Sequence, residues 1–268
     1  MTYTVRRGSA GALAVIVCAM LLGVPAPEAR ADLAQRIARA DAYLAGRPGT
    51  VGYVVRDRAT NAAYRNAAAG AMIWTASTIK LAMVVDLLTR ERTGQIALTP
   101  ADRQLMADMI HSSDSNAADT LWARYGGPDN TAFNRNFPAY GMTNLRPQQG
   151  FGDTYPYWGF QKSTADDLDR LINFTLNQLP AAQAAAIVSE MQHLDPNQQW
   201  GVWGAGPAMA PGNKNGWSQE QGGWVVNSVG FAGPQQRYTL AIMNALDGEG
   251  GYDDGVETTT RLAQILLG

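Results

Sequence analysis

The chain has 268 residues, of which 46% are hydrophobic, and it carries 21 basic and 23 acidic side chains. This composition is typical of a globular protein, and the small acidic excess gives no reason to expect nucleic acid as a partner. One cysteine and two distant histidines, His111 and His193, argue against disulfides, a histidine-based zinc site and a Ser-His-Asp triad, so we expect no metal and no cofactor.

The first 31 residues are typical of a secretory signal peptide. Arg6-Arg7 precedes an apolar run over residues 11–24, and Ala29-Arg30-Ala31 provides a cleavage site. The apolar run is too short and wrongly flanked for a membrane span. Cleavage after Ala31 predicts a mature protein of residues 32–268 with a net charge of about −4, secreted or located in the periplasm or cell envelope.

The same segment allows two other interpretations. A lipid anchor on Cys18 is disfavoured, because Val15-Ile16-Val17 leaves no small residue directly before the cysteine. Arg6-Arg7 also allows export by a twin-arginine route, although two arginines equally fit the positive region of an ordinary signal peptide.

Hydrophobic spacing predicts helices and strands along the rest of the chain. Residues 32–45 carry apolar side chains at helical spacing, whereas residues 51–55 alternate as a strand does. Thr99-Pro100 and Ser163-Thr164 are start signals for helices. The predicted helices span 32–45, 77–88, 99–110, 116–125, 131–140, 163–176, 181–194 and 254–267, and the predicted strands lie in a hairpin over 51–65 and at 224–229 and 237–243.

The string Ser77-Thr78-Ile79-Lys80 opens an apolar run, which places Ser77 in the first helical turn with Lys80 on the same face. A serine hydroxyl needs a neighbouring base to take its proton, and a lysine can be that base when burial or nearby positive charge lowers its pKa. Lysine is rare here, with only Lys80, Lys162 and Lys214. The alternative is a serine cap followed by a lysine that extends to the surface.

Two more strings follow in order. Ser113-Asp114-Ser115 precedes a helix that starts near Asn116, and its alternative interpretation is a polar turn capping that helix. Lys214-Asn215-Gly216 precedes Trp217, and its alternative interpretation is an Asn-Gly turn. Each string alone is weakly specific, so the inference depends on their order and context.

With these strings the chain resembles the class A β-lactamases and the penicillin-binding proteins of the same fold, whose motifs are S-x-x-K, S-D-N and K-T-G. The first motif is intact, and the other two depart at one position each. The resemblance runs from about Asp32 to the C-terminus and implies an α+β fold, in which an antiparallel sheet from the N- and C-terminal segments is covered by helices. The implied sheet lobe is about 32–76 with 207–268, and the implied helical lobe is about 77–206.

The resemblance also implies roles for these residues. Ser77 would attack the substrate with Lys80 as general base, Ser113 would relay the proton to the leaving nitrogen, and Lys214 would hold a substrate carboxylate. Further substrate contacts would come from Ser115, which is shorter than the family's asparagine, from Asn116 if the loop shifts by one residue, and from Asn215, Gly216 and Trp217. The glycine would let its strand approach the ligand, and the N–H groups of Trp217 and Ser77 would form an oxyanion hole.

One expected residue is missing. Class A β-lactamases carry a glutamate on a loop between the second and third motifs, where it activates the water that hydrolyses the acyl enzyme. Between Glu91 and Glu190 this chain has no glutamate, and the corresponding loop, about 146–162, offers only Asp153 as a candidate base. Deacylation is therefore expected to be poor.

These observations predict a secreted serine hydrolase that acts on a β-lactam, or on a cell-wall peptide or ester that resembles one. The alternative is a non-catalytic binding protein that kept the cleft and lost turnover. The intact Ser77 and Lys80 favour the enzyme, whereas the altered second and third motifs and the missing glutamate favour the binder. We expect a monomer without a stable membrane span, with a small peptidoglycan-derived molecule or β-lactam as its partner.

Overall fold

The structure is a computed structural model that describes residues 27–150, 152–220 and 222–268. The predicted signal segment up to residue 26, with Cys18, lies outside the described residues. Helix α1 (Pro27–Leu44) begins before the predicted start at Asp32 and so includes Ala31. Within the described part of the chain, no helix is long and apolar enough to cross a membrane.

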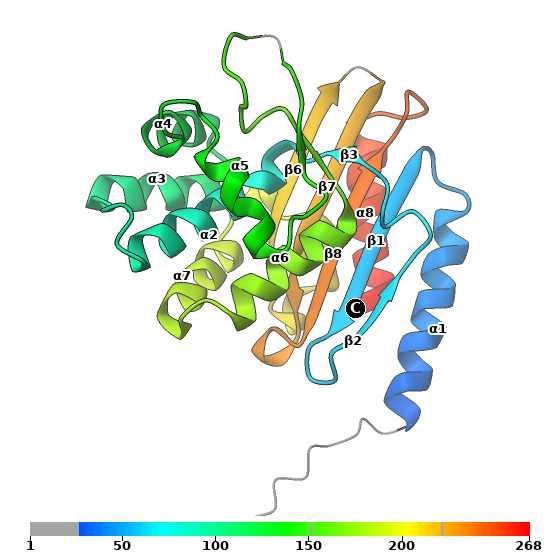
Figure 1. Cartoon of the computed structure of the whole chain (residues 1–268). Helices are drawn as coiled ribbons and strands as arrows, with labels where there is room; N and C mark the ends of the chain where they lie inside the picture. The colour runs from blue at the N-terminus through cyan, green and yellow to red at the C-terminus, as the bar shows by residue number, and fades with distance from the viewer. Residues whose placement is uncertain (1–26, 151, 221) are drawn as a thin grey trace, which may run out of the picture.

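A five-stranded antiparallel sheet forms the centre of the fold, in the order β2-β1-β8-β7-β6 (Figure 1). Its strands come from both ends of the chain, which confirms the predicted α+β fold. They are β1 (Thr50–Asp57), β2 (Ala62–Arg65), β6 (Gly212–Glu220), β7 (Gly223–Ala232) and β8 (Tyr238–Ala245). Strand β6 lies at the edge of this sheet opposite to β2, and it contains the third motif.

Helices cover both faces of the sheet because successive side chains of its strands alternate between them. In β8, Leu240 and Ile242 pack in the core on the side of α1 and α8 (Tyr252–Leu267). Ala241 and Met243 belong instead to the core on the side of α6 (Ala165–Asn177). Figure 1 shows α6 in front of the sheet and α8 behind it.

The middle of the chain forms the helical part. It comprises the 3-10 turn η1 (Ala76–Thr78), α2 (Ile79–Arg92), α3 (Pro100–His111), α4 (Ser115–Tyr125), α5 (Ala132–Asn136), η2 (Phe137–Tyr140) and α7 (Ala181–Gln192). Thr99 caps α3 as predicted, in a reciprocal capping box with Asp102. Thr164 caps α6 by accepting a hydrogen bond from the N–H of Asp167.

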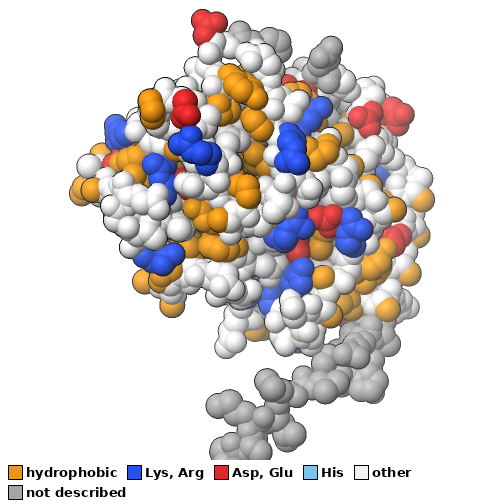
Figure 2. Space-filling model, in the orientation of Figure 1, with side chains coloured by type: hydrophobic (Ala, Val, Ile, Leu, Met, Phe, Trp, Pro, Cys, Tyr) orange, Lys and Arg blue, Asp and Glu red, His pale blue; other side chains and the backbone are white. Residues whose placement is uncertain are grey.

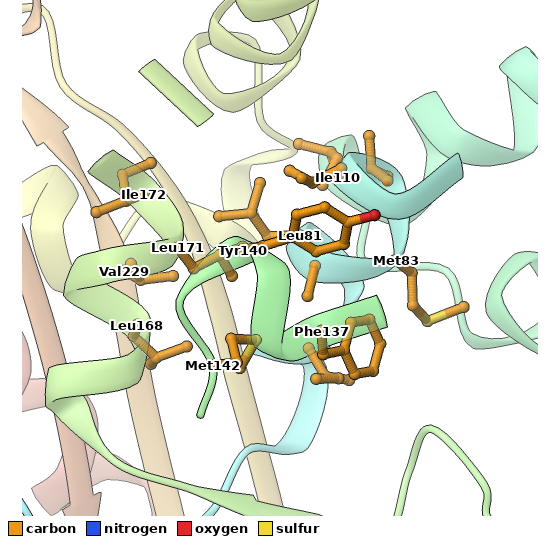
Figure 3. Close-up of a cluster of buried hydrophobic side chains, with 14 of the residues drawn as sticks. Leu81, Met83, Ile110, Phe137, Tyr140, Met142, Leu168, Leu171, Ile172 and Val229 are labelled. Carbon is orange, nitrogen blue, oxygen red and sulfur yellow. The ribbon is translucent and has the colours of Figure 1, made fainter. Parts of the chain in front are cut away.

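The larger core joins these helices to the sheet. Figure 3 shows side chains from α2, η2, α6 and β7 in contact with one another in this cluster. The labelled residues are Leu81, Met83, Ile110, Phe137, Tyr140, Met142, Leu168, Leu171, Ile172 and Val229, and all of them are buried. Helix α2, which follows Ser77, is therefore held rigidly between the other helices and the sheet.

Ion pairs tie α6 and the adjacent strands together on the opposite side from α8. Figure 2 shows basic and acidic side chains interspersed on this face. Arg56 of β1 pairs with Asp169 at 2.5 Å, and Arg65 of β2 pairs with Asp166 at 2.7 Å. Two arginines of the sheet are therefore paired with carboxylates of α6 on this face.

A small second sheet was not predicted. It has the order β3-β5-β4, with β3 at Ile73–Trp74, β5 at Gln161–Ser163 and β4 at Arg146–Pro147. Strands of two or three residues carry too little pattern to be found in a sequence. Strands β4 and β5 hold the two ends of the loop between them. Because β5 also pairs with β3, this loop is fixed beside the segment that leads to Ser77.

Candidate active site

Ser77 lies in η1, half-buried, directly against the edge strand β6. A Cβ atom added to Gly216 would lie only 2.7 Å from the amide nitrogen of Ser77 and 2.6 Å from that of Thr78. A side chain at position 216 would therefore push the strand away from the serine. Ala76, just before Ser77, has a φ of 44°, a left-handed conformation that is strained for a residue with a Cβ and typical of functional sites.

Lys80 is fully buried one turn after Ser77, which excludes the alternative of a lysine extending to the surface. Its Nζ atom donates hydrogen bonds to the carbonyl oxygen of Ser113 at 2.7 Å and to the hydroxyl of Ser115 at 3.2 Å. Burial lowers the pKa of the Lys80 amine to about 8, against the opposing effect of the Asp114 and Asp119 charges. No hydrogen bond joins Ser77 to Lys80 among the residues that the structure describes.

Ser113 joins both lysines of the motifs. Its carbonyl accepts from Lys80, and its hydroxyl accepts a 2.8 Å hydrogen bond from Nζ of Lys214. Ser113 has a φ of 62°, so it is a second left-handed residue with a side chain at the site. This conformation turns the chain just before α4, where Asp114 caps the helix by accepting from the N–H of Ala117 at 2.8 Å.

The second motif therefore combines its two interpretations. Asp114 caps the helix, while Ser113 and Ser115 face Lys80. The side chain of Asn116 is exposed and makes no hydrogen bond within the described ranges, and the loop has not shifted to bring it to Lys80. Ser113 and Ser115, and not Asn116, are therefore the residues of this segment that contact Lys80.

Lys214 is 1% exposed, and its amine also donates to the carbonyl of Asn215 at 2.7 Å. Burial, and next the positive charge of Lys80, lower the pKa of Lys214 well below its usual value. A negatively charged group that pairs with this amine would favour its charged form.

The alternative of an Asn-Gly turn in the third motif is wrong. Asn215 and Gly216 lie in the middle of β6 and pair with Ser228 and Asn227 of β7. A two-residue hairpin turn would need strands that end at Asn215 and restart after Gly216, whereas β6 runs unbroken from Gly212 to Glu220.

Asn215 and Trp217 point away from Lys214, because alternate side chains of a strand face opposite ways. The amide of Asn215 donates to the carbonyls of Gln198 at 2.8 Å and Trp200 at 3.2 Å, so its donors are already used. The ring of Trp217 packs against those of Trp200 and Tyr252, each at 5.8 Å between centroids. The structure therefore does not bring these two predicted contact residues to the side of Ser77.

The loop between β4 and β5 places an aromatic ring beside Lys80. The Nζ atom of Lys80 lies 4.6 Å from the ring centroid of Trp158. Asp153, the candidate base, is exposed and makes no hydrogen bond in the described part of the loop. Sequence reasoning examined this loop for carboxylates and missed Trp158, although its dense aromatic run from Tyr155 to Phe160 was a visible signal.

The two histidines take no part in this site. His111 pairs with Asp195 at 2.9 Å, and His193 contacts the carbonyl of Ser189 at 2.7 Å. Among the residues that the structure describes, no group of three His, Cys, Asp or Glu side chains is placed to hold a metal.

Mycobacterial relatives match this chain. It is 30% identical over 221 residues to the protein named "Putative lipoprotein LppW" of Mycobacterium bovis and of Mycobacterium tuberculosis, over 79% of this chain and 68% of the relative. No protein-family model matches the chain.

Solved structures with the same fold are class A β-lactamases and other β-lactamases. A β-lactamase from Xanthomonas campestris matches with a TM-score of 0.71 over 88% of this chain and 97% of that chain. A β-lactamase from Streptosporangium roseum matches at 0.70 over 87% and 97%, and an ancestral class A β-lactamase matches at 0.68 over 87% and 98%. Each of the three is 17% identical to this chain, so the likeness shows the fold.

Proposed function

Because the chain belongs to the family of the mycobacterial "Putative lipoprotein LppW" and has the fold of the class A β-lactamases, we propose that it is a serine acyl-transfer enzyme of the cell envelope. Its substrate would be a β-lactam, or a cell-wall peptide or ester that resembles one. The observation that carries the proposal is the buried Lys80 amine, which lies one helical turn from Ser77 and whose pKa is about 8.

In the proposed reaction, the Ser77 oxygen attacks the substrate carbonyl and its proton passes to the neutral amine of Lys80. The Ser113 hydroxyl, which already accepts a hydrogen bond from Lys214, then gives a proton to the leaving nitrogen and regains one from Lys80. Hydrogen bonds between a nucleophile and its base commonly tighten only when substrate is bound, so the lack of a Ser77–Lys80 bond does not oppose this role. The close approach of Gly216 supports an oxyanion hole at the Ser77 amide.

Hydrolysis of the resulting Ser77 ester needs a second base, and the chain offers a poor one. Asp153 is exposed, and the loop side of Lys80 is covered by Trp158. General base catalysis supplies about 10² to 10⁴ in rate, so its loss would slow deacylation strongly and leave acylation possible. The proposed enzyme therefore acylates faster than it turns over.

A second candidate function is ligand binding without turnover, and Asn215 favours it. Both of its N–H groups are used by backbone carbonyls, and its buried oxygen has no hydrogen-bond partner in the described structure. A substrate carboxylate near Lys214 would thus gain no donor from this residue. The cleft would still hold a ligand through Ser113 and Lys214.

Intact-mass spectrometry separates these two functions. The protein is mixed with a reactive penicillin, and a covalent adduct that is absent in Ser77→Ala supports the enzyme. No adduct, with a folded protein by circular dichroism, supports the binder. Rapid multiple-turnover hydrolysis would show instead that a base for water is present, and the expectation of slow deacylation would then be wrong.

For the location, the name of the mycobacterial relatives supports the cell envelope and makes a lipid on Cys18 an alternative to a released protein. The mass of the exported protein decides between the two. A chain that starts at Asp32 carries no lipid, whereas a chain that starts at Cys18 with added diacylglycerol is anchored.

A further inference from the structure

Trp158 connects the loop to the proposed base. Its side chain is 7% exposed, with the ring 4.6 Å from Nζ of Lys80. At this distance the amine contacts the face of the indole ring. Lys80 thus meets polar groups on the side of α4 and an aromatic surface on the side of the loop.

Asp119 of α4 holds this ring in place. Its carboxylate accepts hydrogen bonds from the indole N–H of Trp158 at 2.7 Å and from the hydroxyl of Tyr157 at 2.5 Å. Trp122, one turn further along α4, donates from its indole to the carbonyl of Pro156 at 3.1 Å. Three successive loop residues, Pro156, Tyr157 and Trp158, are therefore hydrogen-bonded to α4, which fixes the position of the Trp158 ring.

We propose that Trp158, held by Asp119, is a positioning residue that covers the Lys80 amine and keeps water from the Ser77 ester, so that the acyl enzyme persists. This inference rests on the proposed acyl-transfer function. In hydrolysis, a water oxygen adds to the ester carbonyl, a base takes its proton, and the bond to the Ser77 oxygen breaks as Ser77 regains a proton. With the ring in place, no water can be held against Lys80 from the loop side.

The charged groups near Lys80 are Asp114, Asp119 and Lys214. Asp114 and Asp119 favour its charged form, while burial opposes it more strongly, and Lys214 is the other amine nearby. Removing the ring of Trp158 would hydrate Lys80 and so raise its pKa from about 8 toward 10.5, since burial is the largest cause of the shift.

Three variants test the inference. Trp158→Ala removes the ring that covers Lys80, Trp158→Phe keeps an aromatic ring, and Asp119→Asn weakens the hydrogen bonds that hold Trp158 and Tyr157. The lifetime of the penicillin adduct is measured by intact mass. The pKa of Lys80 is measured by NMR on protein with labelled lysine, where the chain gives only three signals and Lys162→Arg assigns one of them.

Trp158→Ala is expected to shorten the adduct lifetime about tenfold, which corresponds to about 1.4 kcal/mol of barrier, and to raise the pKa of Lys80. Trp158→Phe should keep both values near those of the wild type. Asp119→Asn should give an adduct lifetime between those of the wild type and Trp158→Ala, and only its lifetime is compared, because loss of the Asp119 charge by itself lowers the pKa of Lys80. Unchanged lifetimes in Trp158→Ala overturn the inference, whether or not the pKa moves. If Trp158→Ala does not fold, an unchanged lifetime in Asp119→Asn overturns it.

Failure of the proposed function would look different. If the wild type forms no adduct, the acyl-transfer function is wrong, and persistence of an ester is wrong with it. The NMR measurement would then still show whether Trp158 shields Lys80 from water, because it needs no substrate.

Discussion

The amine of Lys214 donates a 2.8 Å hydrogen bond to the hydroxyl of Ser113, although 101 positions of sequence separate them. The same serine accepts from Lys80 through its carbonyl at 2.7 Å. One residue of the helical part thereby links the amine that follows Ser77 to the amine of the edge strand. Substrate chemistry at Ser77 is therefore expected to change the charge of both lysines.

The rate of acylation should rise with pH through about 8. Lys80 can accept the proton of Ser77 only when its amine is neutral, and its pKa of about 8 places that change within an accessible range. Stopped-flow or quenched mass measurements of adduct formation between pH 6 and 9 would show the rise. A flat profile over this range would argue against Lys80 as the base.

The free energy of unfolding should increase as the pH rises from about 8 to 9. Unfolded lysines keep their protons up to about pH 10.4, whereas burial lowers the pKa of Lys80 to about 8 and that of Lys214 well below its usual value in the folded protein. Each such proton adds up to about 1.4 kcal/mol of stability per pH unit in this window.

Lys214→Met is the matched variant, because it keeps the length of the side chain without a titrating group. Its unfolding free energy, measured in urea, should depend less on pH than that of the wild type. The pKa values of Tyr140 and Tyr157 are raised in the folded protein, so ionisation of the unfolded tyrosines near pH 10 lowers the free energy of unfolding. The measurements therefore stop at pH 9. Equal pH dependence in both proteins would contradict the lowered pKa of Lys214.

The protein should take up a proton when a carboxylate ligand binds. The anion pairs with Lys214 and favours its charged form, so affinity should fall as pH rises. Calorimetry in two buffers of different ionisation enthalpy measures this proton uptake. Lys214→Ala should weaken binding by about 1.5 to 3 kcal/mol, as for loss of a charge-assisted hydrogen bond, and equal affinities would remove Lys214 from the binding site.

Asn215→Asp should destabilise the protein by on the order of 3 kcal/mol. The new carboxylate would lie buried against the carbonyls of Gln198 and Trp200, with no donor to offer them. Asn215→Ser, which only shortens the side chain, should cost about half as much. Urea unfolding compares the two, and the reverse order would mean that Asn215 faces the cleft instead.

Asp102→Ala should lower the unfolding free energy by on the order of 3 kcal/mol. The buried carboxylate caps α3 with Thr99, pairs with Arg124 and accepts from the hydroxyl of Tyr125 at 2.8 Å. Its hydrogen bonds outweigh burial and lower its pKa to about 2, so its contribution to stability is lost only as the pH falls toward 2. Thr99→Ala, which removes the cap alone, should cost about 1 kcal/mol.

The sequence by itself determined the helices and the order of the motifs. Thr99 and Thr164 mark helix starts because a cap acts on N–H groups two or three residues away, a distance within the reach of local pattern. Ser77 and Lys80 lie one turn apart because residues three positions apart share a face of a helix. The requirement for glycine at position 216 also followed from the motif, although only the structure shows that Ser77 and Thr78 are the neighbours that demand it.

Tertiary structure alone decided which side chains meet. Strand β6 is buried on both faces from Gly212 to Gly216, so its sequence carries no alternation that would show Asn215 and Trp217 turned away from Lys214. The contact of Trp158 with Lys80 depends on a loop that Asp119 fixes from another element. Local pattern cannot specify such contacts, because they are set by strand register and by packing between segments far apart in the chain.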